Sequence, residues 1–141
     1  MAEHPLVGTW RLVSVELRDE AGGVAHPLGR DPAGLLTYTA DGHMAGQFGR
    51  AGRAPVAAGD WAAAPEAEVA AAARDYVAYC GTYEVRGDTV VHRVELSLMP
   101  NWIGGEQVRR LALDGEVLTL ATPPMPLGRR PRTFALVWRR A

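Results

Sequence analysis

Two residues that can carry a proton stand opposite each other in a predicted hairpin. Between residues 82 and 97 apolar and polar side chains alternate, and Gly87-Asp88 predicts a tight reversal that sets Tyr83 opposite His92. The alternation puts both on the apolar, inward face. An imidazole with a pKa of about 6.5 beside a phenol can act as acid, base or hydrogen-bond donor. The alternative is a histidine that is simply hydrogen-bonded in the core.

A second reversal, Asp114-Gly115, places Gln107 and Arg109 on the inward face of the next strand. A charged group there needs a partner or a water-filled space, because burying it alone is costly. Arg109 with Gln107 is suited to hold a ligand carboxylate, enolate or carbonyl. The alternatives are an internal salt bridge, or an outward orientation if the strand register shifts by one residue.

These residues define a candidate site inside a cavity. If the protein is an enzyme, we expect His92, Tyr83 and Arg109 to be catalytic. Aromatic and apolar side chains on the inward faces, together with a tryptophan in the loop after residue 98, complete the expected ligand-binding set. That set is Tyr38, Met44, Phe48, Tyr83, His92, Leu96, Trp102, Gln107 and Arg109.

Short strands joined by turn signals surround these positions. Period-two alternation predicts strands over residues 6–18, 34–39, 43–48, the meander 81–122 and 133–140, with loops over 19–32, 49–64 and 123–132. A helix fits Pro65 to Tyr79 and is expected to cover one end of the barrel. Eight regularly spaced strands indicate an all-β fold with one short helix. An antiparallel up-and-down barrel removes exposed edges and leaves room for one small ligand.

Length and composition limit the alternatives. The 141 residues predict a single domain spanning 1–141. A net charge of -1 gives no reason to expect nucleic-acid or membrane binding. Cys80 is the only cysteine, so no intrachain disulfide can form, and no signal sequence is recognised. We therefore expect a cytoplasmic protein, as a monomer or homodimer.

The sequence contains no recognisable signature of a metal or cofactor site. Its four histidines never occur at metal-ligand spacing, and no Gly-rich phosphate loop or Gly-x-Ser-x-Gly elbow is present. We expect no metal and no cofactor.

Several sequence segments resemble a known family. Residues 8–10 read Gly-Thr-Trp and arginines end the last strand, as in lipocalins. The segments 6–14, 34–44, 79–84, 100–102, 105–110 and 118–124 together are similar to the bacterial lipocalin-like domain family. The resemblance implies an eight-stranded lipocalin-like β-barrel whose tryptophan closes the barrel floor and whose final-strand arginine packs across it. Most members of this family have no assigned chemistry, so the resemblance implies no particular reaction.

Three functions fit this sequence. The first is a bacterial binding protein that encloses a small apolar or amphipathic molecule, with Arg109, His92 and Tyr83 at the polar end. The alternative is a cofactor-independent cyclase or isomerase of natural-product (polyketide-type) biosynthesis, which would use the same pocket. This second reading rests on analogy between folds. The third is a barrel filled by its own side chains, which binds a partner on its surface.

Overall fold

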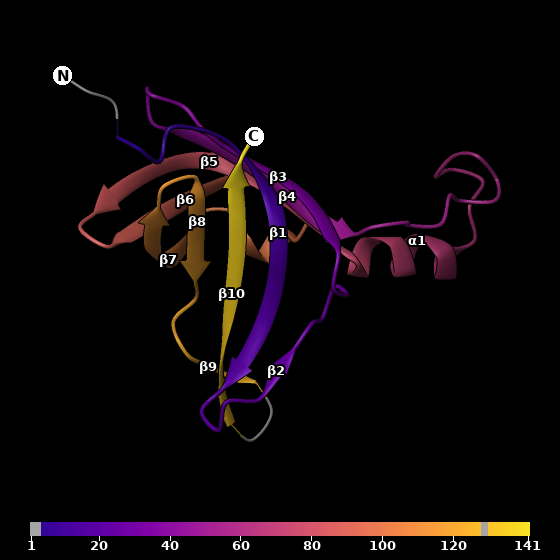
Figure 1. Ribbon diagram of the computed structural model, residues 1–141. Coiled ribbons are helices and arrows are strands. Elements are labelled where there is room, and N and C mark those ends of the chain that lie inside the picture. The colour runs from indigo at the N-terminus through magenta and orange to yellow at the C-terminus, as the bar shows by residue number, and fades with distance from the viewer. Residues whose placement is uncertain (1–3, 128–129) are drawn as a thin grey trace.

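The first and last long strands, β1 (Gly8–Asp19) and β10 (Arg130–Arg140), pair antiparallel and close the sheet on itself (Figure 1). The computed structural model describes residues 4–127 and 130–141. Between β1 and β10 the barrel contains β3 (Pro32–Tyr38), β4 (His43–Arg50), β5 (Tyr76–Arg86), β6 (Thr89–Ser97), β7 (Glu106–Asp114) and β8 (Val117–Ala121). Every pairing is antiparallel, so the predicted eight-stranded up-and-down barrel is confirmed.

Two further short strands lie where the sequence predicted only loops. β2 (Val24–Ala25) pairs with the end of β1, and β9 (Met125–Leu127) pairs with the start of β10. Both therefore extend the sheet at the same end of the barrel, where β1 ends and β10 begins. Residues 128 and 129 of the predicted 123–132 loop lie outside the described residues.

The opposite end of the barrel is closed by a packed aromatic floor. Trp10 and Leu6 are fully buried, and the indole N–H of Trp10 donates to the Leu6 carbonyl at 3.0 Å. The Arg140 guanidinium lies 4.2 Å from the centre of a Trp10 ring. It also donates to the carbonyls of Val7 and Pro5 at 2.9 and 2.7 Å. The expected arginine across the floor tryptophan is therefore present, and it is Arg140.

The first predicted reversal has the expected register, because Tyr83 pairs with His92 across β5 and β6. The register of the second is wrong: the sequence predicts Leu111 opposite Leu118, but Leu111 pairs with Leu120 across β7 and β8. The difference is two residues, so the inward parity of Arg109 is unchanged. Gly87 adopts a positive φ of 61°, which glycine accommodates without strain.

A bulge alters the β5–β6 pairing beyond this hairpin. The register shifts between Cys80 and Gly81, and there the β5 backbone lies so close to β6 that a Cβ at position 81 would be 1.8 Å from the Arg93 carbonyl oxygen. Only glycine permits this close approach. The shift turns Leu96 outward and leaves it 65% exposed, so its predicted place on the inner wall is wrong.

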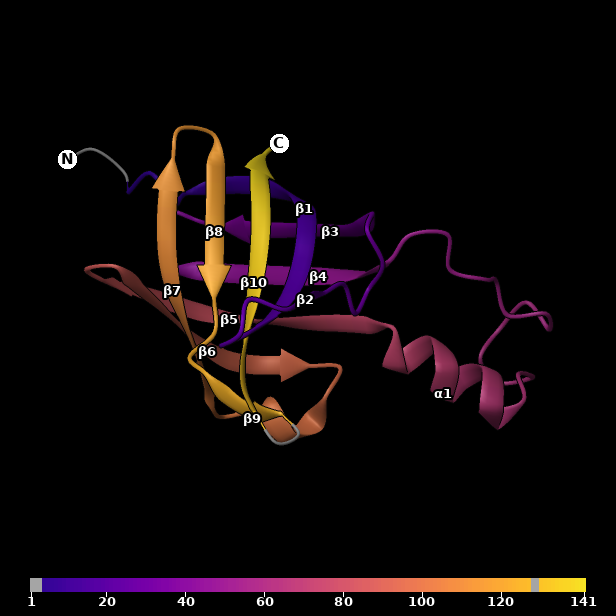
Figure 2. The ribbon, with the colours of Figure 1, turned by 60° about the horizontal axis from the view of Figure 1, so that its bottom comes forward.

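The helix is shorter than predicted and does not cover the barrel. α1 (Glu66–Arg74) contains no buried residue and stands away from the barrel wall (Figures 1 and 2). Residues from Tyr76 onward belong to β5, where Tyr76 pairs with Gly49 of β4. Pairing with β4 outweighs the helical periodicity of this segment, because a barrel strand needs its neighbours. No helix in the described part of the chain has the length and apolar character needed to cross a membrane.

Candidate functional site

The barrel encloses a cavity of about 440 Å³, within the size range of small-molecule sites. Its walls are largely apolar and come from strands around the whole barrel. Leu28, Trp102 and Pro123 come from three different connections and line the end of the cavity remote from the floor. The apolar wall residues include Val15, Leu36, Met44, Phe48, Val77, Leu120, Leu136 and Trp138.

His92 lies in the cavity wall between two tyrosines. Its Nε2 is 2.6 Å from the Tyr38 hydroxyl, and its Nδ1 is 2.7 Å from the Tyr79 hydroxyl. His92 and Tyr38 are 1% exposed, so these hydrogen bonds are largely shielded from water. The three side chains form one continuous chain of hydrogen bonds from β3 through β6 to β5.

The environment keeps the imidazole neutral. Burial, followed by the nearby charge of Arg109, lowers the pKa of His92 to about 3. Burial also raises the pKa of Tyr38 and of Tyr79 above the ordinary value of a phenol, against the opposing effect of Arg109. At neutral pH all three groups are therefore uncharged, and only the guanidinium of Arg109 carries charge among the described lining residues.

Arg109 and Gln107 lie side by side on the cavity wall. Arg109 Nη2 donates to Gln107 Oε1 at 3.0 Å, and Nη1 donates to the Val108 carbonyl at 2.9 Å. Among the side chains described, those of residues 4–124 and 131–141, no carboxylate comes within 4.0 Å of this guanidinium. The internal salt bridge that was the alternative interpretation of Arg109 is therefore absent from this part of the chain.

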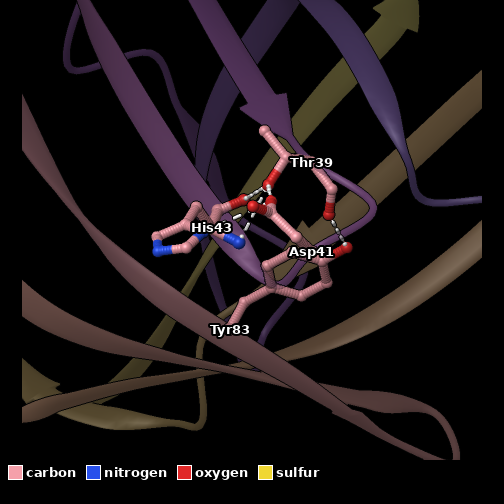
Figure 3. A network of polar contacts seen from close by, with 4 residues as sticks. All are labelled: Thr39, Asp41, His43 and Tyr83. Atoms are coloured by element: carbon pink, nitrogen blue, oxygen red, sulfur yellow. Dashed lines mark hydrogen bonds and ion pairs between the residues drawn. The ribbon is translucent and has the colours of Figure 1, made fainter.

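Tyr83 is positioned differently from the prediction, although its pairing with His92 is as expected. Its hydroxyl donates to the Thr39 carbonyl at 2.7 Å, in the turn between β3 and β4 (Figure 3). In the same turn Thr39 Oγ1 donates to Asp41 at 2.5 Å, and the ring of Tyr83 packs edge-on against Tyr38 at 4.7 Å. Tyr83 thus supports the wall behind the cavity and is not part of its lining.

The comparisons with known proteins give the family. Residues 7–141 match the sequence pattern of the lipocalin-like domain family. The chain belongs to this family. The lipocalin-like domain is also 40% identical over 83 residues to the 4'-hydroxy-3'-methoxypropiophenone carrier protein of Aspergillus oryzae (strain ATCC 42149 / RIB 40). This match covers 52% of this chain and 74% of that protein.

A solved structure shows the same fold. A lipocalin-like protein from Bacteroides uniformis ATCC 8492 matches with a TM-score of 0.50, over 96% of this chain and 98% of that chain. Because the two sequences are only 12% identical, this likeness shows the fold of the lipocalin-like domain and nothing of its ligand.

The structure brings together most of the predicted site residues. Tyr38 contacts His92 from behind the wall and does not itself line the cavity, whereas Leu96 and Tyr83 lie outside it. The predicted residues that do line the cavity of the lipocalin-like domain are Met44, Phe48, His92, Trp102, Gln107 and Arg109.

Tyr79 is the site residue that sequence reasoning missed. Its ring lines the cavity, its hydroxyl contacts His92, and Trp102 packs edge-on against it at 6.0 Å. The helix predicted from Pro65 to Tyr79 ends on this residue. Extending the period-two alternation back from Gly81 would have put it on the inner face.

A second depression lies on the outer surface of the lipocalin-like domain, between β3 and β6, and it includes Leu35, Cys80 and Leu96. It has no concentration of titratable groups. Among the described residues, no group of three or more His, Cys, Asp or Glu side chains is arranged to hold a metal ion.

Proposed function

We propose that this protein binds a small hydrophobic or amphipathic molecule inside its barrel. The observation that carries the proposal is the cavity of about 440 Å³, with apolar walls and a polar group of residues along one side. Apolar contacts would supply affinity at about 25 cal/mol per Å² of buried surface. Arg109 and Gln107 would orient the polar end of the ligand.

The relative from Aspergillus oryzae supports this class of ligand. It is named as a carrier of 4'-hydroxy-3'-methoxypropiophenone, which is an aromatic ketone with a phenolic hydroxyl. A molecule of this kind has an apolar ring and polar oxygens at its ends, and it is small enough for a cavity of this volume.

Two substitutions in one strand test whether a ligand enters the barrel. Val15 is 2% exposed and lines the cavity, whereas Val13 in the same strand is 46% exposed on the outside. We expect Val15→Phe to weaken binding of the fluorescent dye anilinonaphthalene sulfonate about tenfold or more, because the larger ring occupies part of the space that the dye needs. Val13→Phe should bind the dye as the wild type does. Equal binding by both variants, or none by the wild type, would count against an internal site.

A second function is favoured by one specific observation, the hydrogen-bonded chain of Tyr38, His92 and Tyr79 beside Arg109. A cofactor-independent cyclase or isomerase would use such donors to stabilise charge that develops on a carbonyl oxygen. Native mass spectrometry can identify a copurifying ligand. Incubation of that ligand with protein would return it unchanged from a carrier. An enzyme would convert it, and Tyr79→Phe would slow the conversion more than it weakens binding.

A further inference from the structure

The hydrogen bonds around His92 leave one phenolic proton without an acceptor. A neutral imidazole has one N–H donor and one nitrogen that accepts. One of the two tyrosines therefore donates to the ring, and the other accepts from it. The tyrosine that accepts keeps its own O–H, and no second partner for the Tyr38 or Tyr79 hydroxyl occurs among the described residues.

The positions of the two tyrosines decide which hydroxyl keeps the proton. Tyr38 is 1% exposed and does not line the cavity, so an unused O–H there would be buried without an acceptor. Such a group is destabilising, because the hydrogen bond that it made to water in the unfolded chain is not replaced. Tyr79 lines the cavity, where its O–H can reach water or a ligand. The favoured arrangement has Tyr38 donating to Nε2 and Nδ1–H donating to Tyr79.

Arg109 supplies further donors to the same wall. Two of the five guanidinium N–H groups bond to Val108 and Gln107, which leaves three. Gln107, which holds the Arg109 guanidinium, pairs with His92 across β6 and β7, so the guanidinium lies on the same part of the wall as the tyrosine–histidine chain. Tyr79 and Arg109 thus present a phenolic donor and a cation on one side of an otherwise apolar space.

We propose that Tyr79 and Arg109 together bind an oxyanion of the ligand, with His92 and Tyr38 as positioning residues that direct the Tyr79 proton into the cavity. The inference rests on the proposed function and deepens it. The ligand then has an aromatic or apolar body and one phenolate, enolate or carboxylate end. Its oxygen accepts hydrogen bonds from the Tyr79 hydroxyl and the Arg109 guanidinium.

The charges that face this position favour an anion. The titratable groups that line the cavity are Tyr79 from β5, His92 from β6 and Arg109 from β7, with Tyr38 from β3 behind His92. The described lining from the remaining strands and connections contains no carboxylate. With the tyrosines and the imidazole neutral, one positive charge stands in a largely apolar surrounding, where its attraction for an anion is stronger than in water.

The first test is the tautomer of His92. Nitrogen-15 NMR of the ligand-free protein distinguishes a protonated from an unprotonated imidazole nitrogen. We expect Nδ1 to carry the hydrogen and Nε2 to accept, and Tyr38→Phe to remove this preference. A protonated Nε2 in the wild type would overturn the proposed direction of the Tyr79 proton.

The second test compares three probes of the same shape: para-nitrophenol, para-nitrobenzoate and the uncharged ether para-nitroanisole. Bound para-nitrophenol should lose its proton about one pH unit or more below the free molecule, seen in its absorption spectrum, because a tenfold preference for the anion corresponds to one unit. Arg109→Gln should abolish the shift and retain para-nitroanisole binding, whereas Arg109→Lys should keep part of it. Tyr79→Phe should reduce affinity for the anion about tenfold.

Tyr83→Phe is the matched control, since Tyr83 lies on the same strand with its hydroxyl on the Thr39 carbonyl. It should leave all three affinities unchanged. If the three probes bind equally and para-nitrophenol titrates normally, the oxyanion inference is wrong while the proposed function stands. If none of them binds, both are wrong. Tighter binding of para-nitrobenzoate than of the phenolate would support the inference and identify a carboxylate as the preferred oxyanion.

Discussion

The two ends of the barrel are formed by the same strands but are closed by different means. At the floor, Trp10 and Leu6 are fully buried, and Arg140 covers the indole while it bonds to the chain before β1. At the other end, Leu28 and Trp102 come from connections and lie over an open volume. The floor fills its space with side chains, whereas the mouth leaves space unfilled.

Because of this difference, we expect the floor to contribute mainly to stability and the mouth mainly to ligand binding. Side chains at the floor contribute apolar burial and hydrogen bonds, and they lie away from the cavity lining. Those at the mouth are partly exposed and contribute less burial, so changing them should affect the ligand more than the fold. Substitutions at the floor should therefore lower stability, whereas those at the mouth should alter binding.

The floor tryptophan should be the most costly residue to remove. We expect Trp10→Ala to lower the free energy of unfolding by about 3–5 kcal/mol, because it leaves a large cavity and an unused Leu6 carbonyl. Urea unfolding followed by circular dichroism measures this loss. Trp61→Ala is the control, since Trp61 is 60% exposed, and it should change stability by less than about 0.5 kcal/mol. Similar losses in the free energy of unfolding of the two variants would contradict a large contribution of the floor to stability.

His92 should make the middle of the barrel sensitive to acid. The unfolded chain takes up a proton on this residue near its ordinary pKa of about 6.5. The folded protein resists protonation until the pH reaches the lowered pKa of about 3. Stability is therefore fully present above about pH 6.5 and falls as the pH decreases, by up to about 1.4 kcal/mol per pH unit.

Urea unfolding at several pH values between about 7 and 4 checks this slope. We expect the free energy of unfolding of His92→Gln to depend less on pH than that of the wild type. The pH dependence of His43→Gln should match the wild type, because the His43 side chain is 60% exposed. An unchanged slope in His92→Gln would show that other groups dominate acid unfolding.

The cation on the floor should contribute less than the indole beneath it. Arg140→Gln should cost about 1–2 kcal/mol, since it removes the contact with Trp10 and two hydrogen bonds to the Val7 and Pro5 carbonyls. Arg139→Gln, on the exposed face of the same strand, should be nearly neutral. Thermal unfolding of the two variants in parallel gives the comparison, and equal melting temperatures would argue against a structural role for Arg140.

The smallest effect on stability is expected at the mouth. Trp102→Ala should lower the free energy of unfolding by less than about 1 kcal/mol, because Trp102 is only half-buried. It should nevertheless speed release of para-nitroanisole several-fold in stopped-flow measurements, since Trp102 lines the cavity and packs against Tyr79. Ile103→Ala is the control, because Ile103 is 50% exposed and lies outside the lining. Equal release rates in both variants would count against Trp102 as part of the mouth.

Much of the barrel could be predicted because its turns are local. Gly87 and Gly115, both with positive φ, fix two hairpins through backbone conformations that glycine favours. The period-two alternation then sets the inward positions of His92 and Arg109, and the two-residue register error at the second hairpin leaves that parity unchanged. No contact beyond neighbouring strands was needed for these assignments.

The predictions for Tyr79 and Leu96 were wrong because contacts between residues distant in the sequence outweigh the local pattern of apolar residues. Tyr79 follows a helical repeat, but pairing with Gly46 of β4 draws it into a strand. Leu96 follows the alternation, but a bulge where Gly81 lies close to the Arg93 carbonyl reverses its face. Neither effect is visible in a single segment, because each depends on the distance to another strand.

The sequence by itself determined the eight strands and the inward faces of His92 and Arg109, since turn chemistry and alternation act over a few residues. The floor built on Trp10 was implied by the resemblance to lipocalins. Only the tertiary structure decided which hydroxyls meet at the imidazole. It brought Tyr38 and Tyr79 to the two nitrogens of His92 and turned Tyr83 to the Thr39 carbonyl. The curvature of the barrel brings Tyr38 and His92 together although they are 54 residues apart in the sequence. This arrangement sets the hydrogen bonds of the site.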